Sequence, residues 1–65
     1  MPIISVTLGP STKAQKKDLV EKLTATAVEV TNIPAGSFTV AIHELAYENL
    51  GVGGRTVEEI RMQKA

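Results

Sequence analysis

Residues 3–34 read IISVTLGPSTKAQKKDLVEKLTATAVEVTNIP and contain two different hydrophobic patterns in succession. The first is a short run rich in apolar β-branched residues. The breaker pair Gly9-Pro10 ends this run, which predicts a strand over residues 2–8. Because two isoleucines stand side by side in the run, we expect the strand to be buried on both faces.

A long helical pattern follows the breaker pair. Thr12 and Gln15 have the spacing of a capping box, which marks the start of a helix. Apolar residues then recur at the helical spacings of three and four, at Leu19, Val20, Leu23, Ala27 and Val30. Asn32 tolerates the left-handed conformation that ends many helices, and Pro34 prevents continuation. We therefore expect one helix between Thr12 and Asn32.

Residues 38–45 have the alternation of a second strand. Val40 and Ile42 are expected to point to one face, whereas Thr39 and His43 point to the other. A strand, a long helix and a second strand make a βαβ unit, whose two strands run parallel. Two strands alone do not make a stable sheet, so we expect a partner subunit to extend this one.

The glycine-rich tail predicts a tight turn. Residues 51–54, GVGG, are too rich in glycine for a helix and fit a hairpin or a close approach of the backbone. They do not follow a strand and open a long helix, so a dinucleotide-binding loop is not indicated. Beyond them, Thr56 and Glu59 repeat the capping-box spacing and predict a short helix over residues 57–62.

Length and composition limit the fold class. The 65 residues include one Phe, one Tyr, one His and no Trp or Cys, so we expect a single domain over residues 1–65. A chain of this size buries only about 60% of its unfolded surface and needs further stabilisation. The absence of Cys excludes disulfides and thiolate metal sites, and one His without a carboxylate cluster predicts no metal site. Self-association remains, so we expect an α/β homo-oligomer.

Charge and hydropathy argue against several kinds of partner. Seven basic residues balance seven acidic ones, so no overall field favours nucleic acid. No apolar run approaches the roughly 18 residues that a membrane span requires, and no secretory signal is recognisable. We therefore expect a cytoplasmic protein without nucleic-acid or membrane partners.

Pro2 is the position that points to chemistry. Initiator methionine is usually removed when the second residue is small, and removal of Met1 would leave the secondary amine of Pro2 at the chain end. An α-amino group titrates at about 7.7–8.0, and burial beside apolar strand residues lowers that pKa because it disfavours the charged form. Such an amine is a base suited to neutral pH, and the proline ring restricts its position.

Three features together resemble the 4-oxalocrotonate tautomerase family: the start Met1-Pro2-Ile3, the βαβ unit, and residues 49–54, NLGVGG, near the end. The resemblance covers nearly the whole chain. It implies a βαβ tautomerase fold of the α/β (α+β) class with a C-terminal hairpin, dimers that form a four-stranded sheet, and assembly of dimers into a hexamer. It also implies that an N-terminal proline moves a proton between the atoms of an enol or dienol, without a cofactor or a metal.

The resemblance assigns residues to the site only in part. It makes Pro2 the catalytic base and places Leu8, Leu50 and Val52 among the apolar residues near the substrate. Thr39 stands where the best-known members have an arginine that binds a substrate carboxylate, and the loop after the first strand lacks a second arginine. Leu50 replaces a phenylalanine, although it can still desolvate the amine. The dicarboxylate clamp is therefore missing in its usual form.

Two cations are candidates to replace the missing arginines. Lys13 lies at the expected start of the helix, where the macrodipole and the backbone amides favour an anion. The alternative is that it is an ordinary solvated lysine. Arg55 directly follows the matching glycines, where it can reach the pocket of a neighbouring subunit or form ion pairs between subunits. The single histidine, His43, is more typical of a packing or interface residue than of a catalytic one.

The sequence thus predicts an enol–keto tautomerase that acts on a small unsaturated 2-hydroxy or 2-oxo acid with Pro2 as general base. In a related hypothesis the same proline activates water for dehalogenation or hydration, but no helper residue is identifiable. The alternative from another class is a non-catalytic homo-oligomer that binds a small acid and has lost the arginine clamp. Replacing Pro2 distinguishes them, because only the enzyme would lose activity.

Overall fold

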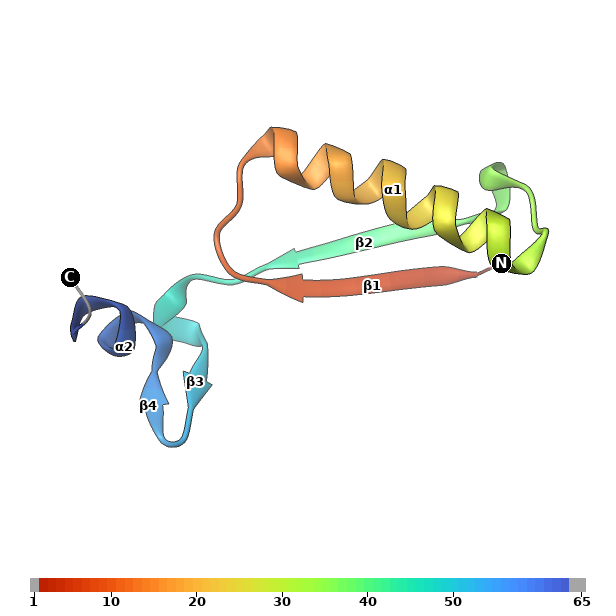
Figure 1. Cartoon of the computed structure of the whole chain (residues 1–65). Coiled ribbons are helices and arrows are strands. Elements are labelled where there is room, and N and C mark those ends of the chain that lie inside the picture. Colours follow the sequence, from red (N-terminus) through yellow and green to blue (C-terminus); the bar gives the residue numbers. More distant parts are fainter. Residues whose placement is uncertain (1, 64–65) are drawn as a thin grey trace.

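The computed structural model describes residues 2–63 of the chain. Their elements, in chain order, are β1 (Ile3–Leu8), α1 (Lys13–Thr31), the 3-10 turn η1 (Ala35–Ser37), β2 (Thr39–Glu44), the 3-10 turn η2 (Tyr47–Asn49), β3 (Gly51–Val52), β4 (Arg55–Thr56) and α2 (Val57–Gln63). Figure 1 shows two parts. The elements β1, α1 and β2 form a βαβ unit, and residues 46–63 form a C-terminal arm that extends beyond the ends of the two strands.

The strands β1 and β2 pair in parallel, as expected. Their register runs from Ile3 opposite Thr39 to Leu8 opposite Glu44. One backbone hydrogen bond continues the ladder at each end: the amide of Thr39 donates to the carbonyl of Pro2 at 3.1 Å, and the amide of Leu45 donates to that of Leu8 at 2.9 Å. The strands are therefore tied together along their whole length, and Pro2 lies at one end of the pair.

The helix α1 begins and ends at the residues that the sequence predicts. Thr12 Oγ1 accepts a hydrogen bond from the amide of Gln15 at 3.0 Å, and the Thr12 amide donates to Gln15 Oε1 at 2.9 Å, which completes the capping box. At the other end, Asn32 adopts a left-handed conformation with φ of 60°, and its amide donates to the carbonyl of Val28 at 2.9 Å. Both caps satisfy backbone groups that a helix end would otherwise leave unpaired.

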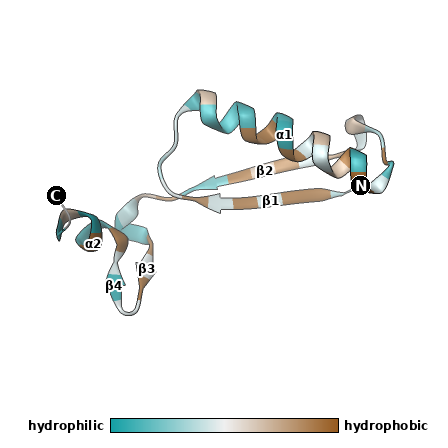
Figure 2. Ribbon diagram, in the orientation of Figure 1, coloured by the Kyte–Doolittle hydropathy of each residue, from teal (hydrophilic) through white to brown (hydrophobic). Residues whose placement is uncertain are grey.

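The helix covers one face of the sheet. Along β1 the residues alternate between half-buried positions, at Ile4, Val6 and Leu8, and exposed positions. The expectation that β1 is buried on both faces is wrong for a single chain, because Ile3 is 65% exposed. Figure 2 shows that apolar residues nevertheless continue along both strands. Most of them, such as Ile4, Val6 and Ile42, lie on the face that α1 covers. On the other face, Ile3 is the large apolar side chain that no described part of this chain covers.

The single chain is open for its size. None of the described residues is fully buried, and large apolar side chains are exposed at Ile3, Val20, Val30, Val52 and Met62. The accessible surface is 4950 Å², whereas a compact monomer of 6.9 kDa exposes about 4000 Å². The radius of gyration is 15.3 Å, against about 11 Å for a compact domain of this length. The single chain is therefore much less compact than a monomeric domain of its length.

The C-terminal arm contains the hairpin that the glycines predict. Val52 in β3 pairs with Arg55 in the antiparallel strand β4. Gly53 and Gly54 form the two-residue turn between the strands and have φ of 62° and 84°. Two successive positive φ values define the hairpin turn that matches strand twist, and they favour glycine. The arm ends in α2, which is one residue longer than expected. Thr56 caps this helix, because its Oγ1 accepts from the amide of Glu59 at 3.1 Å.

None of the helices within residues 2–63 is long and apolar enough to cross a bilayer. The cytoplasmic location stays a prediction.

Candidate active site

Pro2 is half-buried and immediately precedes β1. Its carbonyl accepts the hydrogen bond from Thr39, so these two residues are neighbours at the same end of the parallel pair. Proline has no amide hydrogen once it is in a peptide, which explains why β1 begins one residue later than predicted. Met1 lies outside the described residues. In the chain with Met1 attached, the Pro2 nitrogen is an amide and has no basic lone pair.

Leu8 and Lys13 lie at the opposite end of the strand from Pro2. The six residues of β1 span about 20 Å at the usual rise of a strand. Leu8 ends the strand and is half-buried, whereas Lys13 is exposed at the first position of α1. No acidic residue occupies the first turn of α1. The helix start therefore presents backbone amides and a lysine without a neighbouring carboxylate in that turn.

Glu44 fixes the loop that joins β1 to α1. Its Oε2 accepts from the amide of Ser11 at 2.9 Å, and its Oε1 lies 2.6 Å from Lys16 Nζ. The Ser11 hydroxyl in turn donates to the carbonyl of Gly9 at 3.1 Å. The hydrogen bond from Lys16, followed by that from the Ser11 amide, lowers the pKa of the Glu44 carboxyl. Glu44 thus holds the end of β2 against the start of α1, which positions Lys13.

The remaining candidates lie on the arm. Leu50 directly precedes β3 and is half-buried, and its carbonyl accepts from the amide of Val57 at 2.8 Å. Val52 is 65% exposed, and Arg55 is exposed on the paired strand. In Figure 1 the hairpin lies past the end of β1 that is opposite Pro2. Within one chain, the arm is therefore remote from the proline.

Several of the cations already have partners. Lys16 pairs with Glu44, Lys17 with Glu21 at 3.6 Å, and Lys22 with Asp18 at 3.1 Å. Among residues 2–63, Lys13 and Arg55 have no carboxylate at ion-pair distance. These are the two cations that the sequence singles out for an anionic ligand, and both lie toward the end of the molecule opposite Pro2.

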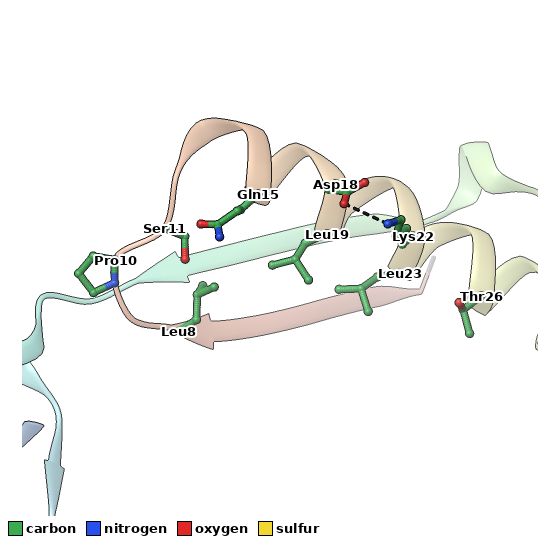
Figure 3. Close-up of a pocket in the computed structure, with 9 residues that line it drawn as sticks. All are labelled: Leu8, Pro10, Ser11, Gln15, Asp18, Leu19, Lys22, Leu23 and Thr26. Carbon is green, nitrogen blue, oxygen red and sulfur yellow. Dashed lines mark hydrogen bonds and ion pairs between the residues drawn. The ribbon is translucent and has the colours of Figure 1, made fainter.

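A groove of about 510 Å³ lies between α1 and β1. Figure 3 shows the side chains of Leu19 and Leu23 on the helix directed toward the strand, and the ion pair of Asp18 with Lys22 above them. Of the predicted site residues, only Leu8 lines this groove. Leu8, Leu19 and Leu23 give the groove an apolar lining, and Pro2 is not among the residues that line it. The groove is therefore better suited to packing of apolar side chains than to proton transfer.

No group of three or more His, Cys, Asp or Glu side chains within the described part of the chain is placed to hold a metal. His43 is exposed on the sheet face that α1 does not cover, opposite Thr7 in the register. The structure thus places the predicted site residues in three groups: Pro2 with Thr39, Leu8 with Lys13, and the arm residues Leu50, Val52 and Arg55. It does not bring the three groups together in one chain.

Two contacts were missed by the sequence analysis. Glu44 acts on Ser11 across 33 positions of sequence, and the ring of Tyr47 packs against Gly9. A carboxylate at the end of one strand and a glycine just after the other strand are weak signals in a sequence. Neither has a fixed spacing to its partner, so only the parallel register brings these residues together.

The fold and the position of Pro2 define a class of small βαβ proteins with a proline at the start of the first strand. A protein-family profile described as "Tautomerase enzyme" matches residues 2–60, so the chain belongs to the tautomerase family. The resemblance seen in the sequence is therefore confirmed, and so is the βαβ fold with its C-terminal hairpin.

Similar proteins match three quarters or more of the chain. A 2-hydroxymuconate tautomerase of Pseudomonas putida is 39% identical over 49 residues, which are 75% of this chain and 78% of that protein. A probable tautomerase of Helicobacter pylori is 34% identical over 67 residues, which cover 97% and 98% of the two chains.

A solved structure of a 4-oxalocrotonate tautomerase homologue from the tomaymycin biosynthetic pathway matches with a TM-score of 0.93 and 35% identity, and covers 98% of this chain and all of that one. A heterohexameric 4-oxalocrotonate tautomerase from Chloroflexus aurantiacus matches with a TM-score of 0.87 and 26% identity, and covers 94% of this chain and all of that one.

Proposed function

We propose that this chain is an enol–keto tautomerase that acts on a small unsaturated 2-hydroxy or 2-oxo acid. The observation that carries the proposal is the place of Pro2 in a chain that belongs to the tautomerase family from residue 2 onward. Its carbonyl is held by Thr39, while its nitrogen stays outside the ladder of β1 and β2. Removal of Met1 turns that nitrogen into a positioned secondary amine.

The reaction needs only a base that gives back the proton it takes. The Pro2 amine removes the hydroxyl proton of the enol, and the oxygen lone pair closes the C=O bond as the conjugated C=C electrons move toward carbon. The protonated proline then delivers the proton to that carbon. Atoms and electrons balance without a redox partner, so the mechanism requires neither a cofactor nor a metal.

The site is completed by another copy of the chain. Pro2 and Thr39 lie at one end of β1, and the arm lies beyond the other end. If a second copy runs antiparallel along the uncovered edge of β1, its arm comes to the Pro2 end of the first copy. The openness of the single chain and the groove beside β1 support such pairing, and the hexameric relative from Chloroflexus aurantiacus supports a dimer or hexamer.

Lys13 and Arg55 bind the substrate carboxylate in this proposal. Both are unpaired within the described residues, and both lie on the part of the chain that the second copy brings to Pro2. Leu8, Leu50 and Val52 supply apolar contacts that exclude water from the amine. Thr39 beside Pro2 is uncharged and cannot form an ion pair with a second carboxylate. This end of the site is therefore suited to an uncharged group of the substrate.

Ultraviolet-monitored ketonisation of 2-hydroxymuconate tests the proposal, with protein whose intact mass shows that Met1 is removed. A second enol acid with a single carboxylate is assayed in parallel. Turnover of either compound above the buffer rate, lost in Pro2→Ala, supports the tautomerase. If neither is turned over and the Pro2→Ala protein binds small acids as well as the parent, the chain is instead a non-catalytic acid-binding oligomer.

A further inference from the structure

The ring of Tyr47 contacts two segments that are far apart in sequence. A methyl group added to Gly9 would lie 2.9 Å from Tyr47 Cε1, so the ring packs directly on the glycine. The guanidinium carbon of Arg61 lies 4.3 Å from the ring centroid, within the range of a cation–π contact. The stack of Gly9, Tyr47 and Arg61 therefore joins the loop after β1, the start of the arm and the helix α2.

We propose that Tyr47 is a positioning residue that sets the direction of the C-terminal arm relative to the βαβ unit. The consequence for catalysis rests on the proposed function, because the arm carries Leu50, Val52 and Arg55 to the Pro2 of another copy. The stack itself is independent of that function and can be tested without a substrate.

The backbone of the arm is organised internally. Leu50 donates to the carbonyl of Tyr47 at 3.3 Å and accepts from Val57 at 2.8 Å, so η2, the hairpin and α2 are joined to one another. The last backbone hydrogen bond of the parallel ladder is the one from Leu45 to Leu8, just before the arm begins. A unit that is internally bonded and covalently attached at one end can pivot at that end. The ring of Tyr47 against Gly9 lies at this pivot.

The residues of the stack allow close contact and hold the Tyr47 ring in place. Gly9 presents bare backbone, so the ring approaches more closely than any side chain at position 9 would allow. Arg61 comes from the last element of the arm and fixes the ring from within the arm itself. A small rotation at Tyr47 is magnified at the hairpin tip, where Arg55 lies. The arm therefore reaches a neighbouring Pro2 in one direction only while the stack is intact.

The direction of the arm can be measured as a distance. The chain has no Cys, so Lys17→Cys on α1 and Val52→Cys on the hairpin provide two unique spin-label sites. Doubly labelled chains are diluted with unlabelled chains, and pulsed electron resonance then gives the distance distribution within one chain. We expect a narrow distribution in the parent and in Tyr47→Phe, and a broader or shifted one in Tyr47→Ala and in Gly9→Ala.

Arg61→Met keeps an apolar stem and removes the charge, and Glu58→Gln on the same helix is its matched control. Because Tyr47 is the only tyrosine and the chain has no Trp, the near-ultraviolet circular dichroism of tyrosine reports on this ring alone. We expect Arg61→Met to reduce that band and Glu58→Gln to leave it unchanged. An unchanged distance distribution in Tyr47→Ala, with an unchanged far-ultraviolet spectrum, would overturn the proposal.

The kinetic consequence is a separate measurement. A cation–π contact at an exposed site contributes about 0.5–1 kcal/mol, which corresponds to a rise in KM of about 2- to 5-fold in Arg61→Met if the contact holds the arm in its binding direction. A positioning role raises KM at temperatures well below unfolding, whereas a purely stabilising role lowers only the melting temperature. If the parent lacks tautomerase activity, the proposed function fails, and the distance measurement still decides whether Tyr47 sets the direction of the arm.

Discussion

The amide of Thr39 donates a hydrogen bond of 3.1 Å to the carbonyl of Pro2. This bond holds the proline by its carbonyl, and the Pro2 nitrogen donates none of the hydrogen bonds between β1 and β2. Because the ring also restricts the backbone dihedral, the nitrogen has little freedom once Met1 is gone. A base at the end of a strand is thus positioned by the sheet itself.

The first prediction concerns the base. Pro2→Ala, with Met1 removed, should lower kcat for the best enol acid by about 100-fold or more, the usual contribution of a general acid–base group. The far-ultraviolet spectrum and the assembly size should stay as in the parent, since the substituted alanine keeps a carbonyl for Thr39. Parent protein that retains Met1 should be inactive. Full activity of that Met1-bearing protein would place the base elsewhere.

The second prediction concerns the unpaired cation at the start of α1. Lys13→Ala should raise KM for an acidic substrate by about tenfold, the value of a charge-assisted hydrogen bond, with a smaller effect on kcat. The matched control is Lys17→Ala on the same helix, whose lysine already pairs with Glu21 at 3.6 Å. Steady-state kinetics at low ionic strength measure both. Equal KM values for the two variants would show that Lys13 does not bind the substrate.

The third prediction tests whether the site is shared between copies. Pro2→Ala and Val52→Asp should each be nearly inactive as pure proteins, because each spoils a different part of the site. When the two are unfolded together and refolded as a one-to-one mixture, about a quarter of the sites in random dimers receive neither defect. Recovery of that share of activity supports a site built from two chains. A mixture that stays inactive would mean that both residues act within one chain.

The fourth prediction follows from the lowered pKa of Glu44. A carboxyl whose pKa is lowered in the folded state stabilises that state above its ordinary value of 4.5, and this stabilisation is lost as the pH falls through the folded pKa. The parent should therefore melt at a higher temperature than Glu44→Gln at pH 7, and the difference should shrink below about pH 4.5.

Thermal unfolding at fixed protein concentration measures this difference. The control is Glu48→Gln, an exposed carboxylate without an ion pair among residues 2–63. A difference between the parent and Glu44→Gln that is the same at about pH 7 and about pH 3.5 would show that the carboxylate charge is not what secures the loop.

The local signals in the sequence predicted the helix ends well. The caps at Thr12 and Asn32 form hydrogen bonds only with groups within four residues. The local sequence is therefore enough to predict them. The strands were predicted one residue too long at the ends, because Pro2 has no amide to donate and because strand ends depend on the partner strand. The hairpin was predictable from glycines that must adopt positive φ.

The candidate site was predictable only as a set of residues. Periodicity places Leu8 at the end of a strand and Lys13 at the start of a helix, but the direction of the arm depends on Tyr47 and Gly9, which are 38 positions apart (47 minus 9). No periodic pattern links them. The burial on both faces that the sequence predicts for β1 is not found in the single chain, where Ile3 is 65% exposed.

The absence of any fully buried side chain among residues 2–63 has a consequence for the living cell. On the assembly proposed above, folding and association are a single reaction whose order in chain concentration exceeds one, so stability rises with the number of copies made. A cell that makes few copies would hold mostly unfolded chain, which proteases remove. The catalytic activity of the cell would then rise steeply over a narrow range of chain concentration, so gene dosage would set a threshold for activity.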